Sequence, residues 1–156
     1  MAGEFGDAKE CILKSYYEKG NALVADAKYA EAIEAYKNAG NYSDATQKLA
    51  AAKEDKAFEE LKQKLKDAYD ACKSSDTTLA SDGLSISIDS KNEYDYDGAV
   101  DIVTIMAKLE LPDSLLNEMT STTALMGRQT RTYDKIEVSW SYHPDNGLDA
   151  IFKIEK

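Results

Sequence analysis

The distribution of apolar residues divides the chain into a helical first half and a β-rich end. In the first half, apolar residues recur every three or four positions, as expected for helices that bury one face. Near the C-terminus, apolar and polar residues alternate, which is typical of strands with one buried face. The pattern therefore predicts an α+β protein, with a helical segment over residues 7–76 and an α+β domain over residues 77–156.

Two helices are predicted at the start of the helical segment. A broad apolar stripe runs from Asp7 to about Asp26, and Tyr29–Ala39 form a second periodic stretch. Gly40 is suited to end the second helix, because a left-handed conformation costs glycine little. The two stretches are therefore expected to form a helical hairpin.

A long third helix is predicted over residues 45–73, which contain no helix breaker and are rich in strong helix formers. Ser43 or Asp44 can cap it by accepting hydrogen bonds from its first amides. Its second half carries a narrow apolar seam of about two heptads, made of Phe58, Leu61, Leu65, Ala68 and Cys72. An independent coiled coil usually needs about three heptads or more, so we expect the seam to dock on the two preceding helices and the protein to be a monomer.

A repeated phrase links the second and third helices. The segment YAEAIEAY, which begins at Tyr29, recurs thirteen residues later as YSDATQKL. Each copy places an aromatic residue at a helix start, an acid in the first turn, and a small residue where another helix can approach closely. The phrase is typical of a helical hairpin repeat.

Residues 16–52 resemble the tetratricopeptide-type repeat, in the looser form found in many bacterial surface and envelope proteins. Tyr16 stands where the family usually has Trp, whereas Asp44 replaces its closing Pro, and the second phrase is shorter than a full repeat. The resemblance implies a role in binding proteins or peptides, or as a spacer. About three repeats are needed to bury a solenoid core, and this segment has only about one and a half. These helices are therefore expected to pack against another surface. The family's small and aromatic packing positions are matched in spacing by Gly20, Ala32, Tyr36 and Ala39.

Tyrosines are concentrated in the helical segment. Tyrosines at helical spacing usually pack into a core with the hydroxyl group at its rim. The alternative is an aromatic patch that recognises a partner peptide. On that alternative, the candidate interaction surface is Tyr16, Tyr17, Tyr29, Tyr36 and Tyr42.

The α+β domain is predicted to begin after a linker at Thr77–Ser81. A strand is expected over Leu84–Ile88, and a helix over Gly98–Leu109 with Asp97 as its cap. A further helix is expected over residues 114–126, with a glycine just past its end. The buried side of the first of these helices is expected to carry Val100, Val103, Met106 and Leu109.

The end of the chain has the clearest strand pattern. Residues 136–142 and 148–154 both alternate, and the intervening HPDNG is typical of a hairpin turn. Residues 128–133 are expected to add another strand. Alternation places Trp140 and Phe152 on one face, where both are expected to be buried. The domain is thus predicted to be an antiparallel sheet with two helices on one face.

The charge of the chain is acidic and uneven. The net charge is −10, and nucleic-acid binding is not expected, because little positive charge is available to neutralise phosphates. Residues 1–75 carry 12 lysines against 14 acidic residues, whereas residues 76–156 carry 7 basic and 15 acidic residues. This asymmetry indicates two differently built parts.

Two features of the sequence indicate where in the cell the protein works: the length of its apolar runs and the character of its first residues. No apolar run reaches the roughly 20 residues that span a bilayer. Residues 1–6 (MAGEFG) have neither the basic start nor the apolar middle of a signal peptide, and they look like a cloning remnant. We expect that a native leader has been removed, and that the protein is secreted or tethered to the envelope.

Catalytic chemistry is weakly indicated. The only histidine, His143, stands beside a proline in the hairpin turn, where a surface position is expected. No nucleophile elbow, phosphate-binding glycine loop or zinc-ligand spacing occurs in the sequence. Cys11 and Cys72 are expected to be small buried hydrophobes, with a bridge between the first and third helices as the alternative.

The segment EYDYDG, which begins at Glu93, imitates the opening of a calcium loop because acids recur at alternate positions before a glycine. The closing position of such a loop needs a bidentate acid, and Thr104 stands there. An acidic helix start favoured by the helix dipole is therefore expected instead. We expect no metal and no cofactor.

The sequence favours a non-enzymatic bacterial interaction or scaffold module, working outside the cytoplasm on a protein or peptide partner. The alternative is a specific inhibitor or ligand-binding domain that uses the face of its antiparallel sheet. Two helices covering a meander sheet are similar in layout to small envelope domains of the β-lactamase-inhibitor type. Outward-facing aromatic or apolar side chains on the sheet would favour this alternative.

Overall fold

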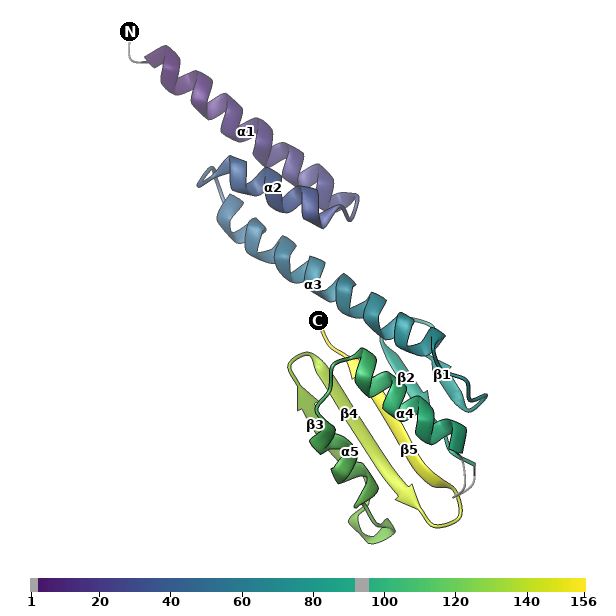
Figure 1. The fold of residues 1–156 in the computed structure, drawn as a ribbon. Coiled ribbons are helices and arrows are strands. Elements are labelled where there is room, and N and C mark those ends of the chain that lie inside the picture. Colours follow the sequence, from purple (N-terminus) through teal and green to yellow (C-terminus); the bar gives the residue numbers. More distant parts are fainter. Residues whose placement is uncertain (1–2, 92–95) are drawn as a thin grey trace. The chain divides into compact units, whose positions relative to one another are not determined.

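The computed structural model describes residues 3–91 and 96–156 and confirms the predicted α+β class (Figure 1). The described residues form five α-helices, one short 3-10 helix and a five-stranded antiparallel sheet. The chain divides into two compact units, residues 1–59 and residues 60–156, called here the helical unit and the sheet unit. The boundary lies within α3 (Ala45–Asp70), so α3 contributes residues to both.

In the helical unit, α1 (Gly3–Ala25) and α2 (Tyr29–Ala39) form the predicted hairpin (Figure 1). The connection is short, and Ala27 turns the chain with a left-handed φ of 57°. The bounds of α2 are those predicted from the sequence. Gly40 follows α2 with a φ of 61°, as expected for a residue that ends a helix.

Small residues bring the helices of the helical unit together. Gly20 lies so close to the ring of Tyr36 that an added Cβ would stand 2.5 Å from Cε1 of that ring. All four residues predicted to pack between helices are buried. The core of the unit consists of Ala32, Tyr36, Ala39, Ala45 and Ala52, with Tyr17, Leu23, Val24, Ile33 and Leu49 packed against it.

The first turns of α1 differ from the predicted buried stripe. Ile12 is 56 % exposed, and Cys11 is also exposed, so the prediction that Cys11 is buried is wrong. The reason is length, because α1 has 23 residues and α2 only 11. The start of α1 therefore extends past the end of α2 (Figure 1).

The long third helix is confirmed, but its seam docks differently from the prediction. The residues of α3 that pack in the core of the helical unit are Ala45, Leu49 and Ala52, from its first half. Leu65 and Ala68 from the predicted seam are fully buried, and both belong to the sheet unit. The face of α2 is therefore covered by residues that precede the seam.

The sheet has the strand order β1-β2-β5-β4-β3, and every neighbouring pair is antiparallel. The prediction that Thr77–Ser81 form a linker is wrong, because the first three of these residues form β1 and pair with β2. Gly83, with a φ of 71°, lies in the turn between these strands. The strands are β1 (Thr77–Leu79), β2 (Ser85–Ile88), β3 (Gln129–Tyr133), β4 (Ile136–His143) and β5 (Gly147–Ile154).

The predicted C-terminal hairpin is confirmed. Val138 pairs with Phe152, and Trp140 pairs with Ala150. Trp140 and Phe152 are both 0 % exposed, on the face of the sheet that α4 and α5 cover (Figure 1). The buried sheet core therefore follows the alternation in the sequence.

α4 (Tyr96–Lys108) buries a different side from the one predicted. Val100 and Val103 are 36 % and 48 % exposed, so their assignment to the buried side is wrong. Asp97 lies inside the first turn of the helix rather than at its cap. The residues of α4 that are buried are Gly98, Asp101, Ile102, Ile105 and Met106.

Asp101 is buried because it receives hydrogen bonds from the chain that connects α3 to β1. Its carboxylate accepts bonds from the amides of Lys73 and Ser74, at 2.9 and 3.0 Å. The hydroxyl group of Thr77 donates a third bond at 2.6 Å. The acid thus satisfies backbone amides that follow α3.

The second helix of the sheet unit is shorter than predicted. α5 (Asp113–Thr120) ends before residue 126, and a 3-10 turn, η1 (Ala124–Met126), follows it. The hydroxyl groups of Ser121 and Thr122 donate to carbonyl oxygens of the last turn of α5, at 2.6 and 2.8 Å. Such local bonds compete with helix continuation, so the Ser/Thr run ends α5.

Candidate interaction surfaces

The five candidate tyrosines have different environments. Tyr17, Tyr36 and Tyr42 form an aromatic cluster in the helical unit. The ring centroids of Tyr17 and Tyr36 are 6.3 Å apart in an edge-on arrangement, and those of Tyr17 and Tyr42 are 5.6 Å apart. These three tyrosines therefore pack on one another, in the way expected for core aromatic residues.

The polar groups around this cluster are engaged within the unit. The hydroxyl group of Tyr17 donates a hydrogen bond to Oδ1 of Asp44 at 2.6 Å. The carboxylate that the sequence offered as a helix cap therefore binds a tyrosine of α1. The hydroxyl group of Tyr36 and Nζ of Lys48 both donate to Oδ1 of Asn21, at 2.9 and 2.7 Å. Burial raises the pKa of Tyr36, and Tyr17, whose ring centre lies 4.9 Å from Nζ of Lys48, raises the pKa of Lys48. The cluster is thus a satisfied packing element.

Tyr16 and Tyr29 lie outside this cluster. Tyr29 is half-buried at the first residue of α2. Tyr16 is 38 % exposed and lines a groove of about 360 Å³ between α1 and α2, called here the α1–α2 groove. The groove is lined by Tyr16, Lys19, Ala30, Glu31, Glu34, Ala35 and Asn38, of which only Ala35 is buried.

The α1–α2 groove combines small side chains with charged ones. Ala35 is 4 % exposed, so the groove reaches the packed interior of the hairpin. Ala30 adds a second small side chain, and Lys19 and Glu31 add charges of opposite sign. Another helix can approach closely where side chains are small, and Tyr16 offers it a large contact surface.

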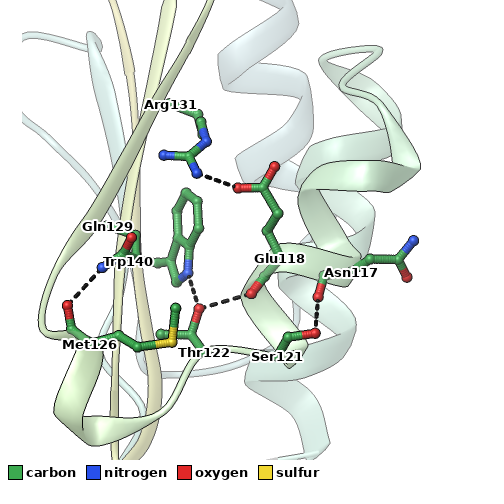
Figure 2. A pocket seen from close by; sticks show the side chains of 8 residues that line it. All are labelled: Asn117, Glu118, Ser121, Thr122, Met126, Gln129, Arg131 and Trp140. Carbon is green, nitrogen blue, oxygen red and sulfur yellow. Dashed lines mark hydrogen bonds and ion pairs between the residues drawn. The ribbon is translucent and has the colours of Figure 1, made fainter.

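A second groove, of about 410 Å³, lies in the sheet unit and is called here the Trp140 groove (Figure 2). Nε1 of Trp140 donates to the hydroxyl group of Thr122 at 2.8 Å. Arg131 forms an ion pair of 2.8 Å with Glu118 and lies 5.9 Å from the centre of the indole ring. The groove is lined by Asn117, Glu118, Ser121, Thr122, Met126, Gln129, Arg131 and Trp140.

β3 and η1 both contribute side chains to the Trp140 groove. Gln129 and Arg131 are alternate residues of β3, so their side chains lie on the face of the sheet that carries Trp140. Nε2 of Gln129 donates to the carbonyl oxygen of Met126 at 2.7 Å, which holds η1 beside the start of β3 (Figure 2). Met126 and Leu125 in this turn are 53 % and 100 % exposed. The turn therefore presents apolar side chains.

The face of the sheet opposite the helices is polar. Arg128 reaches across it and donates to the hydroxyl groups of Ser139 and Ser141, both at 3.2 Å. Ile151, at 37 % exposure, is the one large apolar side chain on this face among the exposed residues of the described strands. This face carries Ser85, Ser87, Glu137, Ser139, Ser141, Asp149, Ile151 and Lys153.

The remaining candidates are separated from one another. His143 is exposed in the hairpin turn, and its Nδ1 accepts a bond from the amide of Asp145 at 3.2 Å. Cys11 and Cys72 are both free thiols. Glu93 and Asp95 of the calcium-like segment lie outside the described residues. Within residues 3–91 and 96–156, no three acidic, histidine or cysteine side chains gather as a metal site.

Sequence reasoning missed most residues of both grooves. In the α1–α2 groove it identified Tyr16 but not Ala30 or Ala35. Ala30 and Ala35 stand five positions apart on α2 and share no helical face, so the sequence offered no signal that could have found them. In the Trp140 groove, the run of Ser121, Thr122 and Thr123 is the signal that could have indicated the early end of α5, but no pattern indicated that Met126 would lie beside β3. That contact depends on tertiary structure.

Comparisons with protein-family models, with curated proteins and with solved structures found no match for this chain. Among the described helices, none combines the length and the apolar character needed to cross a membrane.

Proposed function

We propose that this protein is a non-enzymatic interaction module whose helical unit binds a helix of a partner protein in the α1–α2 groove. The observation that carries the proposal is the groove itself, which has a buried alanine at its floor and the exposed ring of Tyr16 at its side. Small residues at the floor of a groove let a second helix approach closely, and an exposed tyrosine is a frequent binding hot spot.

The incomplete repeat pattern also supports this proposal. About three helical repeats are normally needed to bury a continuous core, whereas the helical unit has one hairpin and the first part of α3. α3 packs on the face of α2 that carries Ala32 and Tyr36. The residues that line the groove lie on a different side of the α1–α2 hairpin from the residues that contact α3. A partner helix in the groove would therefore pack on the hairpin without displacing α3.

The resemblance of residues 16–52 to repeats of bacterial surface and envelope proteins supports a location outside the cytoplasm. Ligand binding through the sheet face, the alternative function, has less support. The uncovered face of the described strands is mostly serine and charged residues, with Ile151 as its exposed apolar side chain. The interaction role of the helical unit is therefore preferred.

Selection of amphipathic helical peptides from a display library, using the whole chain as bait, tests the proposal. We expect enriched peptides to bind the Tyr16→Ala variant about tenfold more weakly, because Tyr16 lines the groove. Tyr96→Ala is the matched control, since Tyr96 is 77 % exposed on α4. Absence of enriched helices, or equal binding to both variants, would contradict the proposal.

A further inference from the structure

We infer that the sheet unit has a second interaction site, at which an extended segment of a partner protein adds as a strand to β3. One side chain of that segment enters the Trp140 groove, and an acidic residue of the segment faces Arg131. This site goes beyond the proposed helix-binding groove, because it lies in the other unit and recognises an extended chain.

The first support is the position of β3 at the edge of the sheet. In the strand order β1-β2-β5-β4-β3, β3 has β4 as its one neighbour among the described strands. Thr130, Arg131 and Thr132 are all exposed. An edge strand presents backbone groups that another chain can pair with. The carbonyl oxygen of Thr130 accepts a 2.8 Å bond from the guanidinium group of Arg131, and an incoming strand would replace this local bond.

The second support is the continuity between this edge and the Trp140 groove. Gln129 and Arg131 line the groove and belong to the edge strand itself (Figure 2). Successive side chains of a strand point to opposite faces, so alternate side chains of an added strand would enter the groove. Met126 lines the groove with 53 % exposure, and an apolar side chain would pack against it. The edge strand β3 thus offers an extended segment both free backbone positions for pairing and an adjacent groove for one of its side chains.

Charge decides between the possible occupants. Arg131 is the central residue of β3, so pairing of two copies about the strand centre would place Arg131 opposite Arg131. Like charges directly opposite each other destabilise a strand pair. An acidic residue at that position would instead be attracted to Arg131 and would share its guanidinium group with Glu118, which lies 2.8 Å away. The fitting occupant is therefore an extended segment with an acidic residue and a neighbouring apolar residue on one face.

Selection of short random peptides on the whole chain provides the probe for this site. Enriched peptides are expected to carry an acid and an apolar residue at alternate positions. Binding of an enriched peptide should slow hydrogen exchange of the β3 amides, because backbone pairing protects them. It should weaken about tenfold or more in Arg131→Glu, since the acid would then face a like charge.

Arg128→Glu is the matched control, because Arg128 precedes β3 but contacts Ser139 and Ser141 on the other face. This change should alter affinity less than about threefold. Trp140 fluorescence checks that both variants remain folded. Equal losses in the two variants, unchanged exchange of the β3 amides, or a concentration-dependent dimer through β3 would overturn the inference.

Discussion

Gly20 of α1 packs directly against the ring of Tyr36 of α2, with room for a hydrogen atom on Gly20 but not for a methyl group. A Cβ at residue 20 would lie 2.5 Å from Cε1 of Tyr36, well inside the distance that carbon atoms tolerate. The ring has little freedom to move, because Tyr36 is 2 % exposed and packs edge-on against Tyr17. The hairpin that carries the proposed binding groove therefore depends on this glycine.

Gly20→Ala should destabilise the helical unit by about 1–3 kcal/mol, because overpacking outweighs the better helix propensity of alanine. Hydrogen exchange of the α2 amides in the whole chain measures this free energy of local unfolding. Gly6→Ala is the control, since nothing lies within 4 Å of a Cβ added at Gly6. Unchanged exchange in Gly20→Ala would show that the two helices separate at no cost.

Asp101→Asn should lower the free energy of unfolding of the sheet unit by about 1.5–3 kcal/mol, the range for a hydrogen bond to a charged group. One carboxylate oxygen accepts the bond from Lys73 and the other accepts those from Ser74 and Thr77. Asparagine replaces one of these oxygens with an NH2 group, which cannot accept. Denaturation followed by Trp140 fluorescence measures the loss, since the chain has a single tryptophan. Asp97→Asn, an exposed position on the same helix, should change stability by less than about 0.5 kcal/mol; equal effects would contradict the anchoring role.

The two cysteines should differ in reactivity. Burial, followed by the nearby Asp101 carboxylate, raises the pKa of the Cys72 thiol to about 12, whereas Cys11 is exposed. The thiolate is the reactive form, so alkylation at pH ~8 should modify Cys11 at least about a hundredfold faster. Peptide mass spectrometry of the alkylated chain measures both rates. Similar rates in the folded protein would show that Cys72 is not shielded.

Asp149 should make the stability of the sheet unit depend on pH. Burial, together with the negative charge of Asp89, raises the pKa of Asp149, and its Oδ1 has no hydrogen-bond partner among the described residues. A carboxyl whose pKa is raised by folding favours the folded state at a pH below its unfolded pKa of about 3.9. This contribution is lost as the pH rises through the folded pKa.

Asp149→Asn should therefore be more stable than the unchanged protein near neutral pH, and the difference should vanish below pH ~4. Denaturant titrations at several pH values, followed by Trp140 fluorescence, measure it. Asp145→Asn is the control, because that side chain is 88 % exposed in the adjacent turn. A stability gain that persists at low pH would exclude ionisation as its cause.

The sequence pattern predicted correctly those parts of the fold in which the structure favoured by neighbouring residues is also the one that tertiary packing requires. The bounds of α2 and the burial of Trp140 and Phe152 followed from periodicity and alternation. The three residues of β1 escaped prediction, because a segment that short carries little pattern and becomes a strand by pairing with β2.

The buried side of α4 was misassigned for a different reason. Val100 and Val103 form an apolar row, but the buried side includes Asp101, and acidic residues are rarely buried without partners. The partners of Asp101 lie 24 to 28 residues earlier in the chain. A pattern within one helix cannot reveal them. The same limit applies to the two grooves, whose walls come from separate elements.

The most direct measurement of the central claim is the affinity of a selected helical peptide for two arginine variants of this chain. Ala30→Arg places a long charged side chain in the α1–α2 groove, whereas Ala50→Arg places the same side chain at an exposed position of α3. Fluorescence anisotropy with a labelled peptide should show affinity lowered about tenfold or more by Ala30→Arg and nearly unchanged by Ala50→Arg. Full affinity in Ala30→Arg would contradict the account, because the helix would then bind elsewhere.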